Sequence, residues 1–228
     1  MNPYEFHSPR EMYFYALTTF GAISRGNPWI RKVKWTRELY EISSFGVGVS
    51  LLSRQLVEIR LSKEEPADGQ SRCGSDIVDI QTTTRNRERR QPDREYKGRI
   101  RNPESRKAEA PEATEDQTIE WIKEAVKSKV DKHYSNHRPF YLLVHANFKK
   151  NGLDILRLQD EVGKLAQTVF GQIWLLTGII SQYPHPFAIG RLYPPTTEAY
   201  LAYDVGSGKD IPRRELHRPF GPMELPGK

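Results

Sequence analysis

Two short, nearly continuous apolar runs constrain the fold of this chain more than any other feature of its sequence. They occupy residues 140–144 and 172–180, and such runs are typical of strands that are buried on both faces of a sheet. A sheet that loses water from both faces needs helices on each side of it. The runs therefore predict an α/β fold in which helices pack against a mixed central sheet.

The apolar pattern elsewhere predicts the helices and two further strands. Apolar side chains recur at helical spacing over 10–24, 36–52, 114–130 and 158–169, and they alternate in the manner of strands over 56–61 and 76–84. Thr114 and Gln117 form a capping box at the start of the third helix. Gly46 and Gly48 lie inside the second helix, where they either weaken it or let a neighbouring element approach closely. Residues 64–74 are rich in turn formers and predict a connection between the two strands.

The positive charge of the chain is concentrated in one segment. Residues 85–109 contain ten Lys and Arg against five Asp and Glu, a net charge of +5 out of +6 for all 228 residues. The segment has few large apolar groups and cannot bury a core of its own. We expect one core domain formed by 1–84 and 114–182, with a basic, mobile insertion at 85–113. An irregular, proline-rich extension at 183–228 holds half of the sixteen prolines and follows the core. Within it, 192–193 and 199–205 are candidates for short edge strands.

Composition and motifs exclude several classes of protein. No stretch approaches the roughly 20 apolar residues of a membrane span, and the N-terminus lacks the pattern of a signal peptide. The single cysteine, Cys73, excludes an internal disulfide and a cysteine-based zinc cluster, and it fits a reducing compartment. Glycine-rich phosphate loops and the common hydrolase motifs are absent. We therefore expect a cytoplasmic protein without a membrane partner.

Two carboxylates and one amide are candidates for a functional site. Strand alternation over 76–84 places Asp79 and Gln81 on one face of the sheet, and Asp68 lies in the preceding connection. Two carboxylates with a backbone carbonyl form the hard oxygen site that Mg²⁺ or Mn²⁺ prefers. The alternative interpretation is structural, with Asp68 as a turn residue and Asp79 as a solvated acid on a strand.

This arrangement resembles the restriction-endonuclease-like, or PD-(D/E)xK, nuclease superfamily. The family pattern is a Pro-Asp turn and then, on the next strand, an acid, any residue and a lysine. Here it corresponds to Pro66 and Asp68, followed by Asp79 and Gln81. The order of elements over 36–180 agrees, because a helix precedes the strand pair and a helix with a buried strand follows it. Two departures are that one residue separates Pro66 from Asp68, and that Gln81 stands where the family has lysine.

The resemblance implies a restriction-endonuclease-like mixed sheet and a metal-dependent nuclease acting on nucleic-acid phosphodiesters. Asp68 and Asp79 would hold Mg²⁺ or Mn²⁺, and Gln81 would take the role of the lysine, which in the family orients the attacking water and offsets phosphate charge. Glu38 and Glu41 are candidates for a further acid, although acids in a first helical turn also stabilise the helix dipole. Because glutamine carries no charge, an alternative stays open. It is a non-catalytic module of the same fold that binds nucleic acid or a protein partner.

The basic segment also has two interpretations. It is either a solvated insertion or an arm that contacts nucleic-acid phosphates, since clustered arginines pair with polyanions and release counterions. The candidate contacts on the second interpretation are Arg85, Arg87, Arg89 and Arg90.

Replacing these four arginines with Gln separates the two interpretations. For an arm, log affinity for duplex DNA falls against log salt concentration by about 0.9 per neutralised phosphate, and the interspersed acids limit the contacts to about three to five. We expect the four-fold variant to lower both the affinity and the slope at an unchanged melting temperature. Fluorescence-anisotropy titrations at several salt concentrations measure both quantities, and an unchanged slope would show that the segment does not contact nucleic acid.

Overall fold

The computed structural model describes most of the helices and strands expected from the sequence. The described residues are 1–24, 33–85, 112–132, 134, 138–146, 149–150, 153–165, 169–178, 187–196 and 199–202. Most of the basic insertion expected at 85–113 and most of the extension expected at 183–228 lie outside them.

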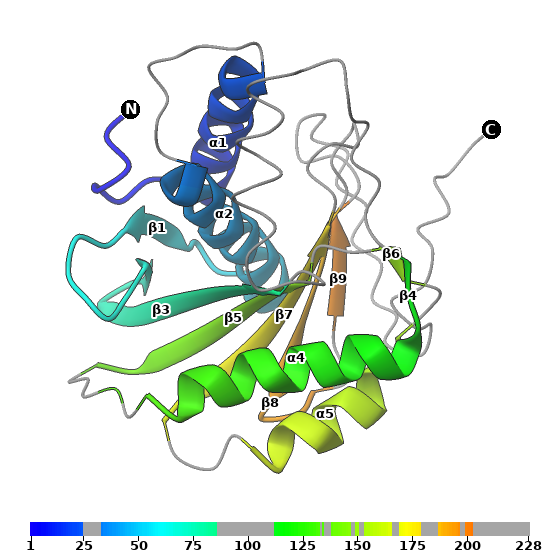
Figure 1. Cartoon of the computed structure of the whole chain (residues 1–228). Helices are drawn as coiled ribbons and strands as arrows, with labels where there is room; N and C mark the ends of the chain where they lie inside the picture. The colour runs from blue at the N-terminus through cyan, green and yellow to red at the C-terminus, as the bar shows by residue number, and fades with distance from the viewer. Residues whose placement is uncertain are drawn as a thin grey trace.

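A sheet of seven strands forms the centre of the structure (Figure 1). In order across the sheet, the strands are β1 (Glu58–Leu61), β2 (Gly69–Cys73), β3 (Asp76–Arg85), β5 (Phe140–Ala146), β7 (Gln172–Gly178), β8 (Phe187–Tyr193) and β9 (Ala199–Ala202). β3, β5 and β7 run parallel to one another, and the outer strands on both sides pair antiparallel. Two short strands, β4 (Glu112–Ala113) and β6 (Lys149–Lys150), form a separate parallel pair.

Helices cover both faces of the sheet. α1 (Pro9–Ser24) and α2 (Val33–Ser53) pack on one face, and α4 (Glu115–Val130) and α5 (Ile155–Gly163) pack on the other (Figure 1). The α/β class with a mixed sheet between helices, as predicted from the sequence, is therefore confirmed. In the part of the chain that the structure describes, no helix is long and apolar enough to cross a membrane.

Strand β5 contributes to the cores on both sides of the sheet. Leu142 and Val144 pack against α4 and α5, whereas Leu143 packs on the side of α1 and α2, and all three are fully buried. Full burial of one such side chain stabilises the fold by about 1.5–3 kcal/mol. The prediction that this apolar run is buried on both faces is confirmed.

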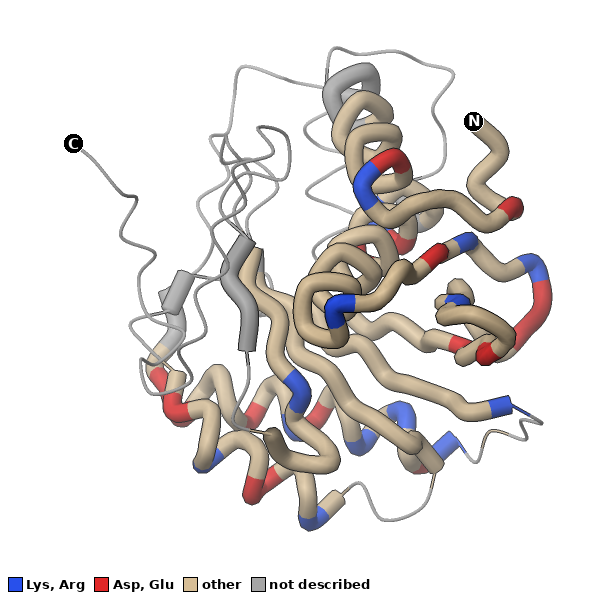
Figure 2. The backbone as a smooth tube through the Cα atoms, turned by 180° about the vertical axis from the view of Figure 1, so that it is seen from behind, with Lys and Arg blue, Asp and Glu red and all other residues tan. Residues whose placement is uncertain are grey.

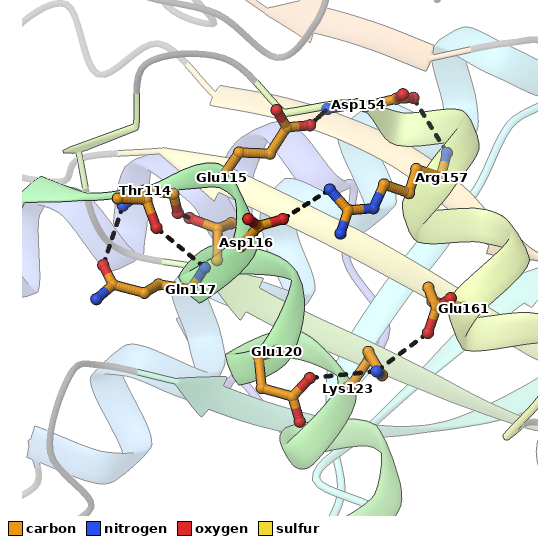
Figure 3. A network of polar contacts seen from close by, with 10 residues as sticks. Thr114, Glu115, Asp116, Gln117, Glu120, Lys123, Asp154, Arg157 and Glu161 are labelled. Carbon is orange, nitrogen blue, oxygen red and sulfur yellow. Dashed lines mark hydrogen bonds and ion pairs between the residues drawn. The ribbon is translucent and has the colours of Figure 1, made fainter.

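Helix α4 begins with the predicted capping box. The backbone N–H of Gln117 donates to Thr114 Oγ1 at 3.3 Å, and the backbone N–H of Thr114 donates to Gln117 Oε1 at 3.1 Å (Figure 3). Next to the cap, Asp116 contacts Arg157 of α5 at 2.7 Å (Figure 3). The first turn of α4 therefore has its N-terminal backbone N–H groups capped by Thr114 and Gln117. The ion pair of Asp116 with Arg157 joins the same turn to α5.

Two segments differ from the prediction. Residues 69–73, expected in a connection, form β2, and the extension expected to be irregular contributes a full strand, β8. β9 lies within the candidate edge strand at 199–205. β2 has no β-branched residue, so its composition does not predict a strand. Hydrogen-bonded partners on both sides, β1 and β3, impose the extended backbone instead. In β8, Phe187 and Ile189 are fully buried, so this strand belongs to the core.

Gly46 and Gly48 let α2 approach the elements packed against it. A Cβ atom at Gly46 would lie 2.7 Å from Ile59 Cγ2 and 2.9 Å from Pro9 Cβ, and one at Gly48 would overlap Ile189 Cγ2. The helix continues through both glycines. Of the two interpretations of these residues, the close approach is confirmed.

Substitution of Gly48 by Ala should destabilise the protein although alanine is the better helix former. The gain in helix propensity is about 1 kcal/mol, while overpacking of a well-filled core costs about 1–3 kcal/mol. We expect a net loss in the free energy of unfolding, measured by urea denaturation. Gly163→Ala is the matched control, because a Cβ atom there meets nothing within 4 Å, and it should leave stability equal or higher. A Gly48→Ala variant as stable as Gly163→Ala would contradict the close packing of α2 on β8.

Candidate functional site

A tight turn sets the pairing of β2 with β3. Gly74 has a φ of +60°, in the left-handed region that favours glycine. Cys73 pairs with Asp76, so only two residues form the turn between the strands. The resulting register places Gln70 directly opposite Asp79.

The same register brings Asp68 next to Gln81. The backbone N–H of Asp68 donates to the carbonyl of Ile80 at 2.8 Å, which extends the pairing one residue beyond β2. Ile80 belongs to the core on the α1 and α2 side, whereas Leu142, the partner of Gln81 in β5, belongs to the core on the α4 and α5 side. Asp79 and Gln81 therefore share the α4 and α5 face, as strand alternation predicted.

One oxygen of the Asp68 carboxylate accepts several hydrogen bonds from β3. Asp68 Oδ2 accepts from the backbone N–H of Thr82 at 2.7 Å, from Thr82 Oγ1 at 3.2 Å, and from the side-chain amide of Gln81. Among the described residues, none donates to the other oxygen, Oδ1. These hydrogen bonds to Oδ2 hold the Asp68 carboxylate in place. They leave Oδ1 without a donor among the described residues.

Asp79 is buried and bound to a second amide. Gln70 Nε2 donates to Asp79 Oδ1 at 2.7 Å, and Arg60 Nε donates to Gln70 Oε1 at 2.7 Å. Arg138 Nη1 lies 3.7 Å from the same oxygen of Asp79. This chain of polar groups orients the carboxylate, and each hydrogen bond in it polarises the next.

The site combines two carboxylates with two guanidinium groups. Arg138 is 46 % exposed, so one of the cations reaches solvent beside Asp79. Tyr134 also lies near, and its pKa is raised by burial and by the negative charge of Asp68. Its hydroxyl therefore stays protonated at neutral pH. Figure 2 shows that charged residues are sparse along the middle strands, and β5 and β7 contain no Lys, Arg, Asp or Glu.

Two carboxylates are ligands of the type that a divalent cation preferring oxygen requires. Asp68 and Asp79 are diagonal neighbours on one face of an antiparallel pair, and such neighbours lie about 7–8 Å apart at Cα. Mg²⁺ is usually held by one or two carboxylates and keeps several waters. Over the residues that the structure describes, no group of three or more His, Cys, Asp or Glu side chains could hold a metal. A cation here would therefore depend on Asp68, Asp79 and neutral oxygens.

The structure does not bring the two glutamates of α2 to this site. Glu41 is fully buried on the α1 and α2 side, where its Oε1 lies 2.9 Å from Nδ1 of His145 and 3.7 Å from Nε of Arg37. Glu38 lies on the same helix. The sheet separates α2 from the face that carries Asp79, so Glu41 pairs with His145 instead of completing a third ligand.

The arginines predicted to contact nucleic acid are only partly within the described structure. Arg85 is the last residue of β3, at the carboxyl end of the parallel strands. Its side chain is not among those that the structure describes. Arg87, Arg89 and Arg90 also lie outside the described residues.

Gln70, Arg60 and Arg138 are among the residues of the site that were not predicted from the sequence. Gln70 was not predicted because β2 was not recognised as a strand. Its partner Arg60 lies opposite Gln70 only because β1 pairs with β2. Arg138 lies 59 positions after Asp79 in the chain, and it arrives there because β5 pairs with β3 directly after it. Recognition of β2 from the two-residue Gly-Ser turn would have predicted Gln70.

Comparison with known proteins found no match: no family model, no curated protein and no solved structure matches this chain.

Proposed function

We propose that this protein is a metal-dependent nuclease that hydrolyses nucleic-acid phosphodiesters on the α4 and α5 face of the β2–β3 hairpin. The observation that carries the proposal is the register of that hairpin, which sets Asp68 beside Gln81 and Asp79 one step away on the same face. The order of elements also supports it, since a helix, an antiparallel strand pair, a helix and a buried parallel strand follow one another in the chain.

In this proposal Asp68 and Asp79 hold Mg²⁺ or Mn²⁺. When bound, such an ion polarises the phosphoryl oxygen and lowers the pKa of a coordinated water. Gln70 and Thr82 keep the two carboxylates oriented through the hydrogen bonds already described. Gln81 contributes an amide that can orient a water molecule.

Arg138 compensates for the charge that Gln81 lacks. In the family that this chain resembles, the lysine offsets the negative charge of the phosphate, and glutamine cannot do so. The guanidinium of Arg138 is half exposed and lies 3.7 Å from Asp79 Oδ1. Arginine binds phosphate oxygens through two parallel N–H groups, so Arg138 can neutralise a phosphate that approaches the two acids.

The second candidate function is a non-catalytic module that binds nucleic acid or a protein partner. The observation that favours it is that each acid is already bonded to a neutral amide, Asp68 to Gln81 and Asp79 to Gln70. A carboxylate in such a pair can act as a purely structural acceptor. In the non-catalytic module the hairpin is a rigid scaffold, and Asp68 and Asp79 do not bind a metal.

Substitution of Asp79 by Asn tests the nuclease directly. Asparagine keeps the shape and the carbonyl that accepts from Gln70, but it removes the charge that binds the cation. We expect cleavage of plasmid, linear DNA or RNA with Mg²⁺ or Mn²⁺ to fall by about 100-fold or more, comparable to the loss of a major electrostatic group in other enzymes. The matched control is Asp76→Asn, an exposed acid on the same strand, which should cleave like the wild type.

Three outcomes test the roles given to Asp79 and Arg138 and the choice between the two functions. Equal cleavage by wild type and Asp79→Asn at matched melting temperatures would remove Asp79 from the reaction. Wild-type protein that cleaves none of the substrates with any of the metals, and yet binds nucleic acid, would support the non-catalytic module. Cleavage lost in Arg138→Gln and recovered in the double variant Arg138→Gln/Gln81→Lys would support the role given to Arg138.

A further inference from the structure

A cavity of about 440 Å³ lies on the side of the sheet opposite the candidate nuclease site. Its roof is the second half of α2, and its floor is formed by strands of the sheet from β2 to β8. The residues that line it on the helix include Phe45, Val49 and Leu52. The volume falls within the range of about 300–1,000 Å³ that is typical of sites for small ligands.

The walls of this cavity are mainly apolar and aromatic. Phe45 of α2 meets Trp174 of β7 edge-on, with ring centroids 5.5 Å apart. Tyr141 of β5 and Val78 of β3 complete the floor next to Trp174. The indole N–H of Trp174 donates to Gln172 Oε1 at 2.9 Å, which fixes the orientation of the ring. Fixed aromatic walls of this kind favour a planar apolar body.

One cation of this wall, Arg191, forms no ion pair with any acid of the described residues. Arg191 projects from β8 beside Trp174, and its guanidinium lies 5.9 Å from the centroid of the indole ring. Its Nε is buried and makes no hydrogen bond within the described structure, and no carboxylate of the described residues forms an ion pair with it. Asp76 also lines the cavity, but it is exposed and does not pair with Arg191. A buried donor on a cation is costly unless an acceptor meets it.

Tyr141 indicates where the positive charge acts. Burial raises the pKa of the Tyr141 hydroxyl, and the positive charge of Arg191 acts in the opposite direction. Tyr141 and Arg191 both line the cavity, so the positive charge faces the same space as the aromatic floor.

We propose that this cavity binds a small aromatic anion. A planar body of one or two rings packs between α2 and the ring of Trp174, and a single carboxylate, sulfonate or phosphate group accepts hydrogen bonds from Arg191. The apolar walls supply affinity and the one unpaired cation supplies selectivity for charge. This binding site is separate from the proposed nuclease and does not depend on it.

Two fluorescent probes with the same rings test the proposal. 8-Anilinonaphthalene-1-sulfonate carries one anionic group, and N-phenyl-1-naphthylamine has the same aromatic body without it. Calorimetric titration of the folded wild type should show one sulfonate probe bound per chain. The dissociation constant of the neutral probe should be at least about tenfold higher, which is the difference expected of one charge-assisted contact. The acid 1-naphthoate should displace the sulfonate probe. Adenosine monophosphate is a second competitor, and its displacement of the probe would identify nucleotides as the source of the aromatic anion.

Variants locate the charge selectivity at Arg191. Arg191→Gln should weaken the sulfonate probe by about tenfold and leave the neutral probe unchanged, so that the two bind alike. Arg157→Gln is the matched control, because Arg157 is 52 % exposed on α5, on the other side of the sheet, and it should change neither. Val49→Trp, which fills the cavity, should abolish both.

Three results would overturn the proposal. They are equal binding of the two probes to the wild type, undiminished binding of the sulfonate probe to Arg191→Gln, and failure of 1-naphthoate to compete. If Val49→Trp does not fold, the comparison of Arg191→Gln with Arg157→Gln decides alone.

Discussion

Gly74 and Ser75 join β2 to β3 through a two-residue turn, and the pairing that follows positions the two carboxylates and the two amides of the candidate nuclease site. Because side chains alternate along a strand, a shift of one residue in this register would move Asp79 and Gln81 to the other face of the sheet. Gly69 helps to hold the register, since a Cβ atom there would overlap Ile42 of α2 and lie 2.9 Å from the carbonyl oxygen of Arg60. The close contact of α2 with β2 thus depends on the absence of a side chain at this position.

Charge balance follows from the same pairing. Removing two carboxylates from water is unfavourable unless cations or hydrogen-bond donors meet them. Gln70 and Gln81 supply neutral donors, and Arg60 and Arg138 supply positive charge at a greater distance. Asp79 therefore meets both an amide donor and the guanidinium of Arg138, whereas Asp68 meets the donors of Gln81 and Thr82.

The sequence predicts the layered α/β fold well because the signal lies in local patterns. The run at 140–144 is apolar at consecutive positions, and this is possible only if both faces of its strand are covered, as Leu142 and Leu143 are. Strand β2 escaped prediction because Gly-Gln-Ser-Arg-Cys has no strand preference, and its conformation comes from its two neighbours. Strand β8 was not predicted in full because the many prolines around it suggested irregular structure.

The candidate site was predictable only in part, for the same reason. Strand alternation placed Asp79 and Gln81 on one face, which is a local property. The pairing of Glu41 with His145 joins residues 104 positions apart and is set by the packing of α2 on β5. No local sequence pattern shows on which face of the sheet a helix packs. The sequence therefore could not show whether Glu41 lies near Asp79.

The proposed nuclease requires that the face of the β2–β3 hairpin holds one divalent ion between Asp68 and Asp79. Titration of the purified protein with Mn²⁺, followed by the electron paramagnetic resonance signal of the free ion, measures this without any substrate. We expect one bound Mn²⁺ per chain, and we expect Asp68→Asn to weaken the affinity by about tenfold or more. Glu64→Gln, which changes an exposed acid in the connection before β2, should bind Mn²⁺ like the wild type. Absence of a bound ion in the wild type, or equal binding by Asp68→Asn and Glu64→Gln, would contradict it.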